Sequence, residues 1–120
     1  MVARIGATAR STAQVLAMAS TEVKNKALEI AAARVETLAD AILTANDRDL
    51  AEAKRRDLSS AIVDRLMLNT DRLEAISAGL RKIAALPNPV GDTLAEWERP
   101  NGLRIQKVRI PLGVIGIIYE

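Results

Sequence analysis

The chain offers few residues that could do chemistry, because its 120 positions include neither cysteine nor histidine. Thiolate nucleophiles, Cys/His zinc sites and imidazole general bases are therefore excluded within these residues. Carboxylates, lysines, hydroxyls and the backbone remain. The best-placed functional residue is Tyr119, at the end of the apolar run 110–119. If that run is a strand, Tyr119 lies at its carboxyl end, where open α/β sheets bind their ligands.

Two further patterns have both a functional and a structural interpretation. Gly113 and Gly116 could let a nucleotide phosphate or ribose approach the backbone, but they lack the GxGxxG spacing on a turn that opens a helix. Close packing of a helix on a sheet explains them better. Asp47, Asp49 and Glu52 could form an acidic metal site. Capping and the helix dipole explain carboxylates at a helix start more simply.

The basic residues and the one tryptophan also allow two interpretations. Lys54-Arg55-Arg56 is the one basic triplet, and it falls where a helix should end, so its cations favour the negative end of the helix dipole. Trp97, in an exposed ribbon, could anchor an interface or pack on its own subunit.

Charge and hydropathy narrow the class of protein. The net charge of +2 comes from Arg4 and Arg10, and basic and acidic residues balance over residues 22–120. Such a balanced surface, with one Trp and one Tyr, disfavours nucleic-acid binding. The apolar run 110–119 has about half the length needed to span a bilayer. The acid-free residues 1–21 faintly resemble a transit peptide, but a docked amphipathic helix explains them better. We expect a cytoplasmic protein with no membrane partner.

The elements that must position these residues are mostly helical, as 21 alanines and an almost aromatic-free composition indicate. The spacing of apolar residues predicts a helix over 3–18 and a second over 22–45. Asn46 is expected to cap a third helix that ends at Lys54 or Arg55. A brief helix near residues 62–67 and a helix over 71–85 complete the series.

The character of the chain changes at residues 87–91, where Pro87-Asn88-Pro89-Val90-Gly91 ends the helical part. Strands are predicted over 93–98 and 103–110, joined by the turn residues 99–102. The apolar run after Pro111 does not alternate, so residues 111–119 are predicted to form a strand buried on both faces, as in a parallel sheet. A parallel neighbouring strand needs a connecting segment of a dozen or more residues, and only Glu120 follows the predicted strand. We therefore expect this sequence to be the opening part of an α/β domain.

Several segments together resemble gamma-glutamyl phosphate reductases, also called glutamate-5-semialdehyde dehydrogenases, of the aldehyde dehydrogenase superfamily. The similar segments follow one another in the same order along nearly the whole chain. They are Lys24-Asn25-x-Ala27-Leu28, Ala45-Asn46-Asp47-x-Asp49-Leu50, Leu68-Asn69-Thr70-Asp71-Arg72-Leu73-Glu74-Ala75-Ile76, residues 83–91, Arg99-Pro100-Asn101-Gly102-Leu103 and residues 111–120.

The resemblance implies a longer protein that uses NADPH to reduce gamma-glutamyl phosphate to glutamate 5-semialdehyde and phosphate, in proline biosynthesis. In this family a nucleophilic Cys attacks the acyl phosphate, and that Cys is absent from these 120 residues. Ile118, Tyr119 and Glu120 match the cofactor-side part of the family's motif, so the resemblance assigns them to NADPH/NADP binding. It also implies a homo-oligomer, and no metal site is expected.

The implied fold class is α/β: a helical layer, a β-ribbon and the first strand of an aldehyde-dehydrogenase-like nucleotide-binding domain. The expected division is a helical part over residues 1–92, an oligomerisation-type ribbon over 93–110 and the first sheet strand over 111–120. The 120 residues alone are expected to be inactive. The alternative function is a non-enzymatic helical module that binds other proteins through a C-terminal apolar strand.

Overall fold

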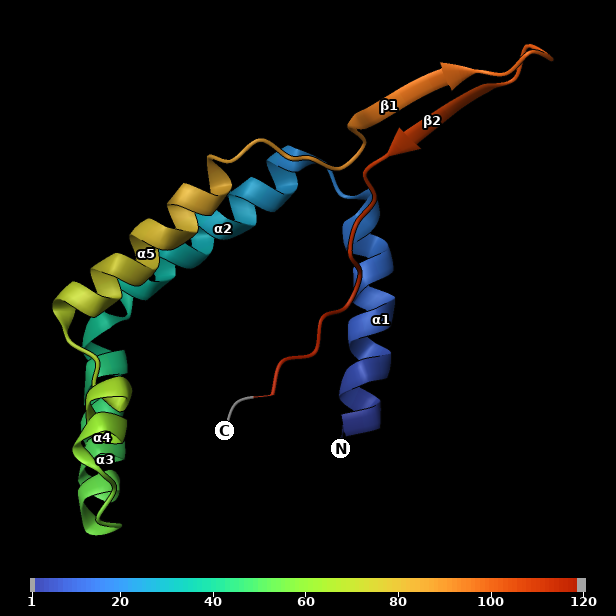
Figure 1. Cartoon of the computed structure of the whole chain (residues 1–120). Coiled ribbons are helices and arrows are strands. Elements are labelled where there is room, and N and C mark those ends of the chain that lie inside the picture. The colour runs from blue at the N-terminus through green and yellow to red at the C-terminus, as the bar shows by residue number, and fades with distance from the viewer. Residues whose placement is uncertain (1, 119–120) are drawn as a thin grey trace. The chain divides into compact units, whose positions relative to one another are not determined.

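A computed structural model describes residues 2–118 of the chain and shows a largely helical polypeptide with one β-ribbon (Figure 1). The chain divides into two compact units, residues 22–86 and residues 1–21 with 87–120. The elements in chain order are α1 (Val2–Met18), α2 (Thr21–Thr37), α3 (Ala39–Arg55), α4 (Ser60–Leu66), α5 (Thr70–Ala84), β1 (Thr93–Glu98) and β2 (Arg104–Val108).

Helices α2 and α5 lie side by side, and the ion pair of Arg81 with Glu36 joins them (Figure 1). Ala32 of α2 is fully buried, and Ser77 and Ala84 of α5 are buried with it. These small side chains bury little apolar area, so large apolar side chains contribute little to this core. Leu73 is the one large aliphatic residue that the described chain buries.

The predicted helix over residues 22–45 is wrong in one respect, because it is interrupted at Leu38. Leu38 has φ −101° and ψ 13°, outside the helical basin, although its N–H still donates to the Arg34 carbonyl at 3.0 Å. The Thr37 hydroxyl donates to the Ala33 carbonyl at 2.7 Å, a back-bond that bends helices. The apolar spacing continues through the break, so periodicity could not reveal it.

The predicted helix start at Asn46 is also wrong, since α3 runs through this residue without interruption from Ala39 to Arg55. The side chain of Asn46 forms hydrogen bonds with the loop after α4 instead. The end of α3 at Arg55 is confirmed, with Lys54 and Arg55 in its last turn. The brief helix near residues 62–67 is confirmed as α4, and α5 begins one residue before its predicted start.

The β-ribbon is confirmed with little change from its predicted bounds. β1 and β2 pair antiparallel, with Trp97 opposite Ile105 and Glu98 opposite Arg104, and a bulge lies between Thr93 and Ala95. In the loop, the N–H of Gly102 donates to the Arg99 carbonyl at 2.9 Å, and the N–H of Arg99 donates to the Leu103 carbonyl at 2.9 Å. Gly102 has φ +80°, a conformation that favours glycine.

The predicted strand over residues 111–119 is not formed by its described part, residues 111–118. The sheet of the described residues has two strands, β1 and β2, and the segment pairs with neither. Its side chains are exposed, up to 93% for Ile118. A strand needs neighbours for its backbone hydrogen bonds, and the described chain supplies none at this segment. The residues are strand-like in type but have no sheet to join.

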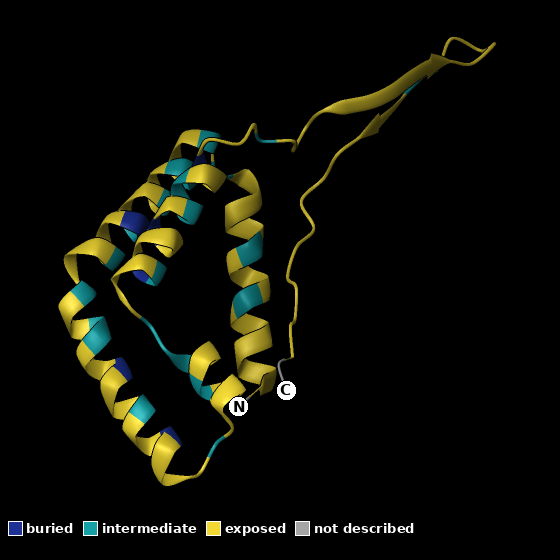
Figure 2. Ribbon diagram, turned by 60° about the vertical axis from the view of Figure 1, so that its left-hand side comes forward, coloured by how far each residue is buried: buried dark blue, intermediate teal, exposed yellow. Residues whose placement is uncertain are grey.

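Large apolar side chains are exposed on every described helix and strand except α3, whereas buried positions are confined to α2, α3 and α5 (Figure 2). So many exposed large apolar side chains indicate faces that become buried against further protein. The most exposed of these side chains are Val2, Met18, Ile110, Leu112 and Ile118.

We expect the 120-residue chain to self-associate through residues 110–118, because an unpaired apolar strand segment templates association. Sedimentation velocity should show reversible oligomers at high concentration, with fast amide hydrogen exchange in this segment at low concentration. The variant Ile115→Lys/Ile117→Lys should be monomeric, since charges on an edge strand block pairing. Thr8→Lys/Gln14→Lys, which places the same charges on α1, is the control. A monomer at all concentrations, with slow exchange over residues 111–118, contradicts this prediction.

Candidate functional site

The residues that the sequence assigns to the cofactor lie at the edge of the described structure. Ile118 is 93% exposed, and Tyr119 and Glu120 lie outside the described residues. Gly113 has φ +83°, and a Cβ added at Gly113 or Gly116 would meet nothing within 4 Å. The two glycines therefore make no close contact with a helix here, and their backbone is open to a ligand or to further protein. Their function stays a prediction.

The acidic residues considered for a metal site do not come together. Asp49 and Glu52 line a hollow of about 230 Å³ between α3 and α4 that Asp47 does not reach. The Glu52 carboxylate accepts from Arg55 Nε at 2.7 Å and Nη2 at 2.6 Å, and this hydrogen bonding holds the pKa of Glu52 below its usual value. No group of three possible metal ligands occurs among the described residues.

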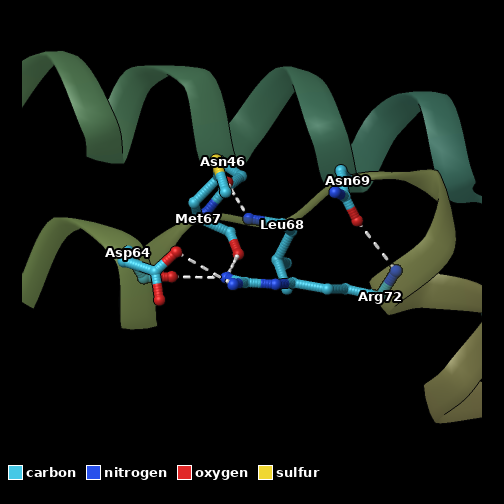
Figure 3. A network of polar contacts seen from close by, with 6 residues as sticks. All are labelled: Asn46, Asp64, Met67, Leu68, Asn69 and Arg72. Atoms are coloured by element: carbon cyan, nitrogen blue, oxygen red, sulfur yellow. Dashed lines mark hydrogen bonds and ion pairs between the residues drawn. The ribbon is translucent and has the colours of Figure 1, made fainter. Parts of the chain in front are cut away.

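The polar constellation with the most complete hydrogen bonding is a clamp on the loop between α4 and α5 (Figure 3). Asn46, 6% exposed, donates from Nδ2 to the Leu66 carbonyl at 2.9 Å and accepts at Oδ1 from the Leu68 N–H at 2.8 Å. A side-chain amide has both a donor and an acceptor, so it can pair with two main-chain groups as another backbone would. Asn46 thus ties the middle of α3 to residues 66–68.

Arg72 holds the same loop from the other side. Its guanidinium donates to the carbonyls of Asp64 and Met67, the latter at 2.5 Å, and to the Asp64 carboxylate at 3.0 Å. The backbone N–H of Arg72 donates to Asn69 Oδ1 at 2.8 Å, which makes Asn69 the N-cap of α5. Figure 3 shows the loop between Asn46 and the Arg72 guanidinium. These groups hydrogen-bond to one another, so the network acts as a brace that fixes the loop.

A second brace joins α2 to α5. Arg81 of α5 donates two hydrogen bonds to the Glu36 carboxylate, one of them at 2.9 Å, and its Nε lies 3.6 Å from Glu29. Hydrogen bonding from Arg81 lowers the pKa of Glu36 from 4.5 to about 2. The fork geometry of Arg matches a carboxylate with two parallel bonds. This brace crosses the interface that Ala32, Ser77 and Ala84 form.

The two faces of the ribbon differ in their side chains. Glu96 accepts from Gln106 at 2.6 Å and from Arg104, and these bonds lower its pKa. Trp97 and its partner Ile105 alternate with these polar residues, so they lie on the opposite face. Trp97 is 44% exposed, which leaves an indole surface open for contact with further protein.

Sequence reasoning missed Arg72 and Arg81, and it assigned Asn46 a different role. Asn has low helix propensity, so Asn46 inside a stretch of otherwise good helix formers is a signal that its side chain has a tertiary partner. No comparable signal marks Arg72 or Arg81, because exposed arginines are common on helices. Their partners are Asp64, eight residues away, and Glu36, 45 residues away.

None of the helices in the described part of the chain is long and apolar enough to cross a membrane. No family model matches the sequence. The chain is 52% identical over all 120 residues to a gamma-glutamyl phosphate reductase of Parvibaculum lavamentivorans. It is 50% identical over 111 residues, 92% of the chain, to the enzyme of that name from Geobacillus thermodenitrificans. The chain spans 28% and 27% of the length of these two relatives.

Solved structures of gamma-glutamyl phosphate reductases also resemble this chain. The crystal structure of the Thermotoga maritima gamma-glutamyl phosphate reductase aligns with 86% of this chain at a TM-score of 0.81 and 36% identity, over 25% of its own length. That of the Saccharomyces cerevisiae protein of the same name aligns with 90% of the chain at a TM-score of 0.84 and 30% identity, over 28% of its length. The resemblance and the α/β class are confirmed, and the chain corresponds to the N-terminal region of these proteins.

Replacing Asn46 by Ala should destabilise the chain by about 1–3 kcal/mol, because the Leu68 N–H and the Leu66 carbonyl lose their partners while still partly buried. Urea unfolding followed by circular dichroism measures the change. Asp47→Ala, at the exposed neighbouring position, is the matched control and should fall within about 0.5 kcal/mol of the parent. Equal stability of the two variants would show that the clamp contributes nothing.

Replacing Glu36 by Gln should remove the pH-dependent contribution of the Glu36–Arg81 ion pair to the free energy of unfolding. Because folding lowers the pKa of Glu36 to about 2, its ion pair stabilises fully above about pH 4.5 and is lost as the pH falls through 2. The variant should therefore unfold at a lower temperature than the parent at pH 7, and the difference should vanish near pH 2. Glu74→Gln, on the exposed side of α5, is the control. A difference that is independent of pH contradicts this assignment.

Proposed function

We propose that this chain is the N-terminal part of a gamma-glutamyl phosphate reductase, in which it forms the helical layer and ribbon that support the catalytic parts. The whole protein reduces L-glutamyl 5-phosphate to L-glutamate 5-semialdehyde and phosphate with NADPH, a step of proline biosynthesis. The observation that carries this proposal is the 52% identity over all 120 residues, with no segment omitted. Membership of the aldehyde dehydrogenase superfamily and a cytoplasmic location are parts of the same proposal.

The chemistry of such a reductase constrains what these residues contribute. A covalent route through an acyl-enzyme needs a thiolate, and the chain holds no Cys. The nucleophile must therefore come from protein outside these 120 residues. What this part supplies is position: a helical unit held by the Asn46 and Arg81 braces, with apolar faces left open for the rest of the protein.

NADPH, when bound, supplies the hydride. Residues 110–118 carry aliphatic side chains, an open backbone at both glycines and no charge. Such a surface fits the flat rings of the cofactor but supplies no cation for its phosphates. We assign Ile118, Tyr119 and Glu120 to the cofactor side of the site, with the phosphates held by other parts of the protein.

The ribbon suits a role in oligomerisation. Trp97 on this ribbon is about half exposed, and aromatic residues concentrate in the buried centres of protein interfaces. A homo-oligomer would cover this face and a small-molecule substrate would bind elsewhere. The second candidate function is a non-enzymatic interaction module. The single observation that favours it is the exposure of large apolar side chains.

A chimera tests the proposal directly. This chain replaces the matching N-terminal region of the Parvibaculum lavamentivorans enzyme, and NADPH oxidation is measured with freshly made glutamyl phosphate. We expect a rate within about tenfold of that of the parent enzyme. The activation free energies should therefore differ by at most about 1.4 kcal/mol. Growth of a proline auxotroph that lacks the reductase should be restored. The 120-residue chain alone should give no turnover.

Two controls separate the possible outcomes. A chimera with Cys-to-Ser substitution at the parental nucleophile should be inactive, which excludes activity from the host. The reading frame that encodes this chain is also sequenced past codon 120. A continuation that resembles the relatives and contains a Cys supports the reductase. A soluble, folded chimera without turnover, together with a stop codon after Glu120, favours the interaction module.

A further inference from the structure

The tip of the β-ribbon carries an Asn-Gly pair in an exposed loop. Residues 99–103 are all exposed, and Asn101 Oδ1 accepts from the Leu103 N–H at 3.2 Å. Gly102 follows with φ +80°, and a Cβ placed on it would meet no atom within 4 Å. The side-chain carbonyl carbon of Asn101 therefore lies next to a backbone nitrogen that no side chain shields.

We propose that Asn101 is a site of spontaneous deamidation and isoaspartate formation in this protein. The Gly102 nitrogen, after losing its proton to hydroxide, attacks Cγ of Asn101. An N–Cγ bond forms, the Cγ–Nδ2 bond breaks, and ammonia leaves with a proton from water. Water then opens the succinimide ring. Attack at Cγ gives Asp, attack at the main-chain carbonyl gives isoaspartate, and no oxidant or reductant is needed.

The other four asparagines lack one of the conditions for this reaction. Asn88 precedes Pro89, which has no N–H to lose. Asn25 and Asn46 lie inside α2 and α3, where the helix fixes the following N–H in a hydrogen bond. Asn69 precedes Thr70, whose side chain crowds the nitrogen, and its own Oδ1 caps α5. Asn101 alone among these five combines exposure, a loop conformation and a following glycine.

The native loop slows the reaction but does not prevent it. The Gly102 N–H donates to the Arg99 carbonyl at 2.9 Å, so attack requires a transient opening of the tip. Only exposed loop residues need move for this opening, which makes it a local event of low cost. The other asparagines in regular structure need a helix to unfold.

Conversion to isoaspartate changes the ribbon itself. The main chain then runs through Cγ and is one carbon longer, so the Asn101–Leu103 and Gly102–Arg99 hydrogen bonds cannot both form. Loop geometry fixes the register of a hairpin. A longer loop should therefore loosen the pairing of Glu98 with Arg104, the pair nearest to the tip. The modification also adds one negative charge to the tip of the ribbon.

The experiment is incubation of the 120-residue chain at pH 8.5 and 37 °C, followed by peptide mass spectrometry that distinguishes Asp from isoaspartate. We expect Asn101 to convert at least about tenfold faster than any of the other four asparagines, because only its neighbour lacks a Cβ. Amide hydrogen exchange at Arg99 and Arg104 should rise with the converted fraction. In guanidinium chloride Asn101 should react faster still.

Gly102→Ala is the matched variant, and it should slow conversion at Asn101 in guanidinium chloride, where the native loop is absent and the strain of Ala at φ +80° plays no part. Asn101→Asp adds the charge without lengthening the chain, so it should leave exchange at Arg104 unchanged. Conversion at another asparagine that equals or exceeds the rate at Asn101 in the native chain overturns the proposal. So does the absence of conversion at Asn101 in the native chain when the denatured chain reacts.

Discussion

One buried amide governs the arrangement of the helical unit. Asn46 lies in the middle of α3, although Asn has a low helix propensity. Its side chain pairs with the main chain of the loop that leads into α5. The loop is fixed between this amide and the Arg72 guanidinium, so the entry point of α5 is set by side chains from two different helices. Removing either partner leaves main-chain groups without hydrogen bonds in a partly buried place, which is why the interaction is costly to lose.

The helical unit achieves order with little buried apolar area. Its buried positions are mostly Ala and Ser, and ion pairs such as Arg81 with Glu36 also join α2 to α5. Exposed ion pairs contribute modestly, and their value here is in setting which faces of α2 and α5 meet. Several large aliphatic residues, among them Val23, Ile30 and Ile83, are exposed instead. That distribution fits a unit whose main apolar contacts lie with further protein, as the 28% coverage of its relatives indicates.

The ribbon and the segment after it differ in how much they depend on other protein. The ribbon closes its own hydrogen bonds through a two-strand ladder and a glycine-containing loop, so it forms within these residues. Residues 111–118 have the side chains of a central strand but no ladder to join. The backbone of this segment is unpaired, and the surfaces of Gly113 and Gly116 are open.

The sequence by itself determined the helices, their approximate ends, the ribbon and the family resemblance. These depend on local signals: apolar spacing, Pro87 and Pro89 as breaks, the Arg99–Gly102 turn residues and motifs in a fixed order. Tertiary structure decided the break at Leu38, the role of Asn46 and the braces of Arg72 and Arg81. Each of these rests on a partner or a backbone angle that local periodicity does not record. It also decided that residues 111–118 stay unpaired, because a strand is defined by its neighbours and not by its own residues.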